Sequence, residues 1–325
     1  MTTDYDVIII GAGPAGASCA KHLVDNGVKT LVVEKRKLPR YKCCGGILSI
    51  RSLEFINQNY GQIPTEIICK NENVNIKMSV SGKSFFDYTT ESWRNIHRHL
   101  FNNWLIKESN TDLLENTLYV NHDNEGNTIN VKLKKNNNYI NLSCKYLIGA
   151  DGGNSFVRKK IDSYKGDFVL YRQLICMADS DINKNCYYYL TGNKFSSGYS
   201  CFNYKNDLFY YGTMFSLHKK KNNYMDMINN LLVEKFNLKI YEILRKEQCI
   251  SNISMEESRF FWGKENVLLI GESSGLISGI GEGISSALIS GKMCAEAIID
   301  NKNNPMKEYT KKVNEEKKCV TINWK

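Results

Sequence analysis

Residues 6–16, Asp-Val-Ile-Ile-Ile-Gly-Ala-Gly-Pro-Ala-Gly, join an apolar run to a glycine-rich turn. The apolar run predicts a buried parallel strand, and residues 14–26 predict a helix that ends before Gly27. Residues 29–34 predict a second buried strand, which completes a strand–turn–helix–strand unit. We therefore expect a Rossmann-type α/β sheet at the start of the chain.

The turn has the G-x-G-x-x-G spacing of dinucleotide-binding loops. Gly11 permits the tight turn, Gly13 lets the backbone approach a pyrophosphate, and Gly16 lets the helix pack close to the strand. The helix N-terminus directs N–H groups and the positive end of its dipole at phosphates. Glu34 ends the second strand, where its carboxylate can accept from ribose hydroxyls. A plain glycine-rich turn is the alternative, but the strand, helix and acid together favour dinucleotide binding.

A second turn of this kind lies in residues 146–158. A strand ends at Gly149, Asp151 follows in the turn, and a helix is predicted to begin at Ser155. An ordinary Asp-Gly turn is the alternative for this segment taken alone.

A third turn follows the apolar strand at residues 266–270. Gly271 and Glu272 come directly after this strand, and Gly281 and Gly283 precede the last long helix. The N-terminus of that helix can stabilise negative charge on a bound ring. The three turns in this order are more specific evidence for a dinucleotide site than any one of them alone.

The bulk composition is that of a globular protein, with 42% hydrophobic and 24% charged residues in 325. The net charge of +9 indicates either an anionic partner or a lysine-rich surface, and the scattered basic residues favour the surface. No motif supports nucleic-acid binding. The eleven cysteines lack zinc spacings, so we expect no metal and mostly free thiols in a reducing cytoplasm. No apolar run reaches the ~18 residues of a membrane span, which leaves peripheral membrane contact open.

Stretches with the alternating pattern of antiparallel strands separate the three turns. A discontinuous cofactor domain with an inserted antiparallel-sheet substrate domain explains this order most simply. We assign to the cofactor domain residues 1–66, 92–162 and 252–300, to the substrate domain residues 67–91 and 163–251, and to a C-terminal helical tail residues 301–325.

Together the three turns resemble those of FAD-dependent oxidoreductases of the p-hydroxybenzoate hydroxylase-like superfamily, which includes geranylgeranyl reductases and aromatic hydroxylases. In that superfamily the first turn holds the ADP part of FAD and the two later turns hold the rest. Residues 40–46, Arg-Tyr-Lys-Cys-Cys-Gly-Gly, resemble the K-x-C-G-G segment of geranylgeranyl reductases, which lies against the flavin. Arg98 resembles the arginine of that family's R-x-x-F-D-x-x-L helix.

The resemblance implies an FAD site built from residues of all these segments. We expect it to comprise Gly11, Gly13, Ala15, Gly16, Glu34, Lys35, Arg36, Cys44, Gly45, Gly46, Arg98, Asp151, Gly271, Glu272, Gly281, Gly283 and Ile284. The chain departs from the family at Glu272, where an aspartate is usual. Cys44 is either a thiol that acts in proton transfer or a small residue that packs there.

Residues 198–207 are similar to the G-Y-x-W-x-F-P-K strand pair over the substrate cavity of geranylgeranyl reductases. This similarity implies Tyr199, Cys201 and Tyr211 as pocket residues, with Cys201 in the place of the usual aromatic residue.

The resemblance implies hydride transfer from reduced FAD to a carbon–carbon double bond of a prenyl or other apolar small molecule. NAD(P)H as a transient donor or a small redox protein would reduce the FAD. Two alternatives stay open: an FAD-dependent monooxygenase or halogenase-like enzyme, and a flavin-binding protein without catalysis.

Overall fold

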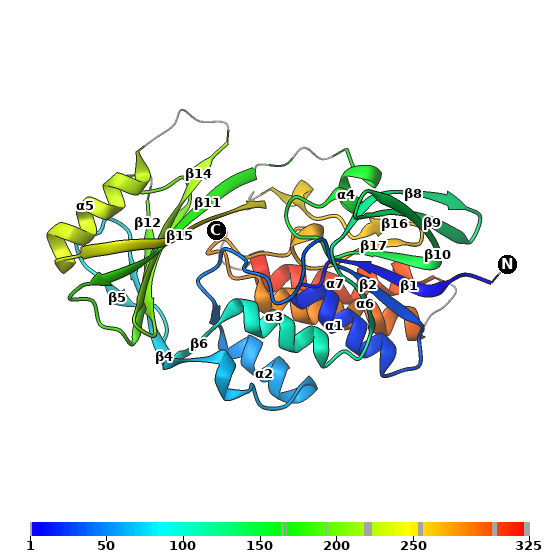
Figure 1. Cartoon of the computed structure of the whole chain (residues 1–325), viewed down its shortest axis with the longest axis horizontal. Coiled ribbons are helices and arrows are strands. Elements are labelled where there is room, and N and C mark those ends of the chain that lie inside the picture. The colour runs from blue at the N-terminus through cyan, green and yellow to red at the C-terminus, as the bar shows by residue number, and fades with distance from the viewer. Residues whose placement is uncertain are drawn as a thin grey trace. The chain divides into compact units, whose positions relative to one another are not determined.

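The computed structural model describes residues 2–163, 166, 168–192, 194–217, 223–252, 256–300 and 304–321. It divides into two compact units, each assembled from segments that are far apart in the sequence (Figure 1). Unit 1 comprises Met1–Arg40, His99–Asp167 and Asn252–Lys325, and unit 2 comprises Tyr41–Arg98 and Phe168–Ser251. One unit is built on a largely parallel sheet and the other on a largely antiparallel sheet, which confirms the predicted α/β fold class.

The sheet of unit 1 has the strand order β16-β17-β10-β1-β2-β7. Strands β17, β10, β1, β2 and β7 run parallel, and β16 is antiparallel to β17. The bounds are β1 (Tyr5–Ile10), β2 (Thr30–Val33), β7 (Asp112–Leu114), β10 (Asn138–Gly149), β16 (Gly263–Lys264) and β17 (Val267–Leu269). β1 lies at the centre, where Ile9 is in register with Val32 of β2 and Ile148 of β10.

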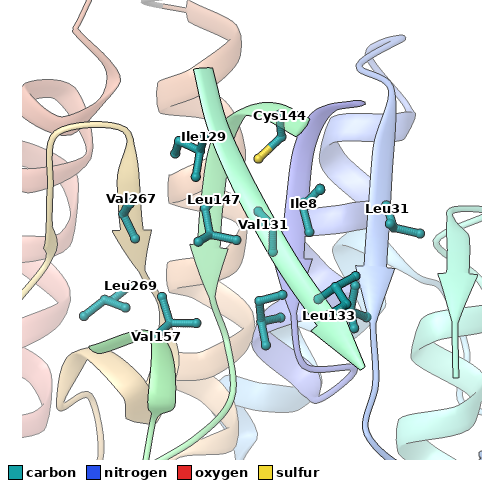
Figure 2. Close-up of a cluster of buried hydrophobic side chains, with 12 residues drawn as sticks. Ile8, Leu31, Ile129, Val131, Leu133, Cys144, Leu147, Val157, Val267 and Leu269 are labelled. Atoms are coloured by element: carbon teal, nitrogen blue, oxygen red, sulfur yellow. The ribbon is translucent and has the colours of Figure 1, made fainter. Parts of the chain in front are cut away.

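An antiparallel ribbon extends β10 and covers one face of this sheet. It consists of β8 (Thr117–Glu125) and β9 (Thr128–Lys135), and β9 pairs with the first half of β10. Figure 2 shows β9 crossing in front of the parallel strands, and Val131 and Leu133 of β9 belong to the same hydrophobic cluster as Ile8 and Leu147. Because both faces of the central strands are covered, their residues are continuously apolar.

Helices α1 (Pro14–Val24) and α6 (Ile284–Asp300) pack against each other in unit 1. Small residues allow the close approach: the Ser18 hydroxyl donates to the Leu288 carbonyl at 2.7 Å. Helix α7 (Pro305–Thr321) also packs on α6 and places Glu316, 2% exposed, where it accepts from Ser286 at 2.6 Å. The described part of unit 1 also contains the α-helices α4 (Phe156–Ile161) and α3 (Arg98–Lys107), which begins at the unit boundary, and the 3-10 helices η2 (Glu257–Arg259) and η3 (Gly271–Ser274).

The sheet of unit 2 has the order β15-β11-β14-β13-β12-β4-β6-β3, with β5 paired to β4. The pair β12–β4 is parallel, and the pairs β11–β14, β14–β13, β13–β12, β4–β6, β6–β3 and β4–β5 are antiparallel. The bounds are β3 (Ile47–Leu48), β4 (Ile68–Ser79), β5 (Phe86–Asp87), β6 (Trp93–Ile96), β11 (Phe168–Asp179), β12 (Cys186–Thr191), β13 (Tyr199–Lys205), β14 (Leu208–Ser216) and β15 (Lys239–Asn252). Helix α5 (Tyr224–Phe236) packs on one face, and α2 (Ile50–Asn59) follows β3.

The unit boundaries differ from the domain boundaries expected from the sequence. Residues 41–66 and 92–98 cluster with unit 2 rather than with the cofactor domain. The cause is strand pairing, since β3 pairs with β6 and β6 pairs with β4 of the second sheet. No described helix is both long and apolar enough to cross a membrane.

Candidate cofactor site

The three predicted turns lie side by side at one edge of the unit 1 sheet. Strands β1, β10 and β17 are parallel neighbours, so their carboxyl ends meet at the same edge. Gly11 follows β1, Asp151 follows β10, and Gly271 follows β17. The carboxyl edge of a parallel sheet is where α/β folds bind their ligands, and the structure brings the three turns together there.

The glycines of the first turn have different tasks. Gly11 has a φ of +111°, and a Cβ on it would lie 2.5 Å from the Ala150 carbonyl oxygen. A Cβ on Gly16 would overlap the carbonyl oxygen of Gly11. Gly13, the N-cap of α1, has no atom within 4 Å of its Cβ position, and no side chain caps the helix there. Gly11 and Gly16 therefore close the turn, whereas Gly13 leaves open space beside unpaired helix N–H groups, which fits a pyrophosphate.

Glu34 is 2% exposed and belongs to the turn itself. Its carboxylate accepts from the Ala12 backbone N–H at 3.2 Å, the Arg36 backbone N–H at 3.1 Å and Arg40 Nη2 at 2.8 Å. The buried Nε of Arg40 has no hydrogen-bond partner. A buried N–H without an acceptor is rare in proteins and fits a polar ligand group at this position.

Sequence reasoning missed Arg40 as a cofactor-site residue. Only its place six residues after Glu34 could have suggested the ion pair. The side chains of Lys35 and Arg36 are exposed, and Ala15 lies beneath the third turn, its Cβ 3.0 Å from the Cβ position of Gly271.

Asp151 directs its carboxylate at its own helix. It accepts from the Ser155 hydroxyl at 2.5 Å and from the backbone N–H groups of Phe156 at 2.6 Å and Val157 at 3.3 Å, at the start of α4. Burial raises the pKa of the Asp151 carboxyl, and these hydrogen bonds oppose the shift. Gly152, with a φ of +85° and open space at its Cβ position, leaves this turn accessible to a ligand.

The third turn packs closely against its neighbours. The N–H of Gly271 donates to the Ser290 hydroxyl of α6 at 2.9 Å. A Cβ on Gly153 would lie 2.6 Å from Glu272 Oε1, so the longer acid that replaces the usual aspartate extends to the second turn. The departure from the family is therefore accommodated within unit 1, in the space beside Gly153.

The start of α6 already carries a carboxylate. Gly281 has a φ of +77°, Gly283 lies against Ile277, and Ile284 begins the helix with 7% exposure. Glu282 accepts from the Ser285 N–H at 3.0 Å and from the Ser285 hydroxyl at 2.7 Å. The Glu282 carboxylate neutralises part of the positive charge at the N-terminus of α6. Less of that charge is then left to stabilise a negatively charged ring, which is the role that the sequence predicts for this helix end.

The Cys44-Gly45-Gly46 segment lies in unit 2, and the sheet of that unit determines its shape. Cys44 Sγ accepts from the Gly46 N–H at 3.3 Å and from Arg98 Nη1 at 3.4 Å. A Cβ on Gly45 would lie 2.5 Å from the Tyr187 hydroxyl, and a Cβ on Gly46 would overlap the amino group of Lys205. The two glycines therefore make room for side chains of β12 and β13.

Lys205 is a buried cation that holds this segment in place. It is 4% exposed and donates to the Ile96 carbonyl at 2.6 Å, Asn95 Oδ1 at 3.0 Å and the Gly46 carbonyl at 3.3 Å. Burial lowers the pKa of its amino group. The sequence contained this lysine at the end of the G-Y-x-W-x-F-P-K resemblance, but only the fold shows what it contacts.

Tyr199 and Cys201 share one face of the unit 2 sheet with Tyr171 and Tyr189. The Tyr171 hydroxyl lies 2.8 Å from Cys201 Sγ, and the rings of Tyr189 and Tyr199 are 4.7 Å apart. Burial raises the pKa of Tyr171 and Tyr189 well above the usual value and that of Cys201 to about 11.

Tyr211 lies on the opposite face of the sheet, so the structure does not bring it together with Tyr199 and Cys201. It is in register with Phe202, and both lie in the core beneath α5, where the Tyr211 hydroxyl donates to Asn229 Oδ1 at 3.5 Å. Successive residues of a strand face opposite sides, so Cys201 faces away from Phe202 and is in register with Gly212 rather than with Tyr211.

Comparison with known proteins decides the family. The family model described as FAD binding domain matches residues 4–225, more than half of the chain. The chain belongs to this FAD binding domain family. The resemblance to FAD-dependent oxidoreductases is thereby confirmed, and the open Gly13 position and the unpartnered Arg40 Nε fit FAD as the cofactor of this FAD binding domain protein.

Among curated relatives, Protein CbrA of Escherichia coli K12 is 25% identical over 302 residues, which cover 87% of this chain and 81% of CbrA. A geranylgeranyl bacteriochlorophyll reductase-like protein from Thermoplasma acidophilum matches with a TM-score of 0.81 and 21% identity, over 96% of this chain and 83% of that protein. A triple mutant of the flavin-dependent brominase Bmp2 matches with a TM-score of 0.75 and 17% identity, over 97% and 86% of the two chains. These likenesses show a shared fold.

Proposed function

We propose that this FAD binding domain protein reduces a carbon–carbon double bond of a prenyl or other apolar small molecule. The observation that carries the proposal is the edge of the unit 1 sheet where the three turns meet. The first turn has the open Gly13 position beside the Glu34–Arg40 pair, and the second turn is accessible at Gly152. The K-x-C-G-G resemblance of residues 42–46 supports the reductase branch.

The residues of unit 1 divide the binding of FAD among them. The N–H groups at the start of α1 would bind the pyrophosphate, and Glu34 with Arg40 would orient the ribose. Exposed Lys35 and Arg36 add positive charge beside this position. Bound FAD supplies hydride transfer, and the protein supplies positioning and exclusion of water.

We assign to unit 2 the contacts with the substrate. Tyr199 and Cys201 lie on a face lined with tyrosine rings, and aromatic rings present large apolar surfaces to a hydrocarbon. The segment that carries Cys44, Gly45 and Gly46 is held by Arg98 and Lys205, so its backbone is fixed before any ligand binds. NAD(P)H or a small redox protein is the proposed electron donor.

A monooxygenase or halogenase-like reaction is the second candidate. The tyrosine hydroxyls on the face of Tyr199 favour it, because they offer hydrogen bonds to an aromatic substrate with polar groups. The fold shared with the brominase Bmp2 is compatible with such a reaction. A flavin-binding role without catalysis is the third candidate, and capping of α6 by Glu282 is the feature that favours it.

Anaerobic stopped-flow reduction separates these candidates. The FAD-loaded protein is reduced by NAD(P)H or dithionite and then mixed with prenyl or aromatic acceptors, with and without oxygen. Reoxidation of the flavin by a prenyl acceptor without oxygen is the expected result. Turnover that occurs only with oxygen would contradict the reductase function and support the monooxygenase or halogenase-like function. If no acceptor reoxidises the flavin in either condition, the non-catalytic role is favoured. The Gly13→Ala variant serves as the control that should bind flavin at least about tenfold more weakly.

A further inference from the structure

Cys43 and Cys249 of unit 2 lie in contact although 206 positions separate them in the chain. Cys43 belongs to residues 41–46, which form no helix or strand, and Cys249 lies on β15, the edge strand of the sheet. The Cys249 thiol donates to the Cys43 carbonyl oxygen at 3.6 Å, and the two thiols also hydrogen-bond to each other. Both sulfurs are thiols in this structure.

A second contact holds residues 41–46 against β15. The Arg245 guanidinium stacks on the Tyr41 ring, 3.5 Å from its centroid. Arg245 and Cys249 are four positions apart on β15 and face the same side, as side chains of a strand do at even spacing. Glu247 lies between them and binds Arg245 at 3.2 Å. The chain thus holds Cys43 against Cys249 through contacts that do not involve either sulfur.

The two thiols differ in accessibility. Cys43 is 6% exposed, whereas Cys249 is only partly buried. The hydrogen bond to Cys249 and burial raise the pKa of the Cys43 thiol, and Glu247 and Cys44 add to the shift. Cys44 is engaged elsewhere, because its sulfur accepts from Arg98 and from the Gly46 N–H. Cys249 is therefore the thiol that meets a dissolved oxidant, and Cys43 is the neighbour that can react next.

We propose that Cys43 and Cys249 are a peroxide-sensitive thiol pair that closes to a disulfide and ties residues 41–46 to β15. The Cys249 thiolate attacks one oxygen of hydrogen peroxide, which gives a sulfenic acid and releases hydroxide. The Cys43 sulfur then attacks the sulfenic sulfur, the S–S bond forms, and the departing hydroxyl leaves as water with the proton of Cys43. In sum, two thiols and one peroxide give one disulfide and two waters.

The proposed disulfide would tie the segment that carries Cys44, Gly45 and Gly46, which Arg98 and Lys205 already hold, covalently to β15. A disulfide whose closure changes this segment is a means of regulation by oxidants. The inference requires no flavin, so its failure and the failure of the proposed function are separate outcomes.

Peptide mapping of the full chain tests the pair directly. The protein is treated with hydrogen peroxide, the remaining thiols are blocked with N-ethylmaleimide, and the product is digested with trypsin. Cleavage after Lys42, Arg51, Lys246 and Arg259 separates residues 43–51 from residues 247–259. The expected product joins these two peptides with the loss of two hydrogen atoms, carries one N-ethylmaleimide group on the remaining Cys44 thiol, and separates again with dithiothreitol.

Variants decide which sulfur is used. The joined peptide should persist in Cys44→Ser and disappear in Cys43→Ser and Cys249→Ser, whose folding is checked by circular dichroism. Cys249→Ser alone suffices if Cys43→Ser does not fold, because Cys249 lies on an edge strand. The proposal is overturned if peroxide oxidises the exposed Cys319 but leaves residues 43–51 and 247–259 unlinked, or if the link requires Cys44.

Discussion

Gly13 and Gly16 belong to one motif, yet their substitutions should have different effects. Alanine at Gly13 meets open space, so we expect the free energy of unfolding to change by less than ~0.5 kcal/mol. The methyl group would stand where the pyrophosphate approaches, so FAD affinity should fall at least about tenfold. Alanine at Gly16 would overlap the Gly11 carbonyl and should cost about 1–3 kcal/mol of stability.

Thermal unfolding of the apoprotein and titration of FAD fluorescence measure the two effects. The interpretation of Gly13 fails if its alanine variant binds FAD as tightly as the unaltered chain, and that of Gly16 fails if its variant is equally stable.

Glu34 is expected to stabilise unit 1 before it binds any cofactor. Glu34→Gln leaves the charge of Arg40 without its carboxylate in a site where the Glu34 side chain is 2% exposed. Loss of one partner from a buried pair costs about 3 kcal/mol. The matched control is Arg36→Gln, whose exposed side chain should change stability by less than ~0.5 kcal/mol. Urea unfolding of the apoprotein compares the two, and equal midpoints would show that the pair with Arg40 contributes nothing.

At the residue scale, the sequence predicts backbone requirements better than side-chain partners. The tasks of Gly11, Gly13 and Gly16 follow from their spacing in one local turn. The contacts of Tyr187 with Gly45 and of Lys205 with Gly46 join residues over 100 positions apart, which no local pattern contains. The sequence groups Tyr211 with Tyr199 and Cys201, but it does not show which face of each strand α5 covers, and Tyr211 lies on the covered face.

The β8–β9 ribbon should make unit 1 sensitive to acid. His122 of β8 lies 2.6 Å from the Tyr119 hydroxyl, and burial, followed by Lys160, lowers the pKa of its imidazole below 6.5. As the pH falls through 6.5, the unfolded chain takes up a proton that the folded chain does not. The free energy of unfolding therefore decreases as the pH falls from 6.5 to the lower pKa that His122 has in the folded chain.

Urea unfolding at about pH 7.5 and about pH 5.5 measures this loss, and His122→Gln should reduce it. His97 of unit 2 also has a pKa lowered by burial, so the double variant with His97→Gln should reduce the loss further. An unchanged pH dependence in the double variant would contradict the assignment.

At the element scale, long patterned segments are predictable and short strands are not. The strands and helices of the three turns each carry a continuous apolar run or a helical pattern, and the structure contains them. Strand β3 has two residues, too few for any pattern, yet its pairing with β6 places residues 41–66 and 92–98 in unit 2. The predicted boundaries differ for this reason.

At the scale of the whole molecule, the chain builds each unit from segments interleaved with the other. The three turns of unit 1 are supplied by residues 11–16, 149–153 and 271–284, and only the parallel register of β1, β10 and β17 brings them to one edge. The order of the turns along the chain predicted this edge, because parallel strands end on the same side of their sheet.

Hydrogen exchange with and without FAD should therefore report three protected regions far apart in the sequence. We expect FAD to slow amide exchange in peptides that cover residues 11–16, 149–153 and 271–284, whereas ADP should protect the first region and leave the third unchanged. Saturating FAD at 100 times its Kd stabilises the folded chain by about 2.7 kcal/mol, which suffices to slow exchange that depends on opening of the bound site. The Gly13→Ala variant at the same FAD concentration is the control: with a Kd about tenfold higher, its stabilisation falls to about 1.4 kcal/mol, and protection should weaken in all three regions. If bound FAD protects the first region alone, the second and third turns do not contact the cofactor, and the sheet edge holds only its adenine half.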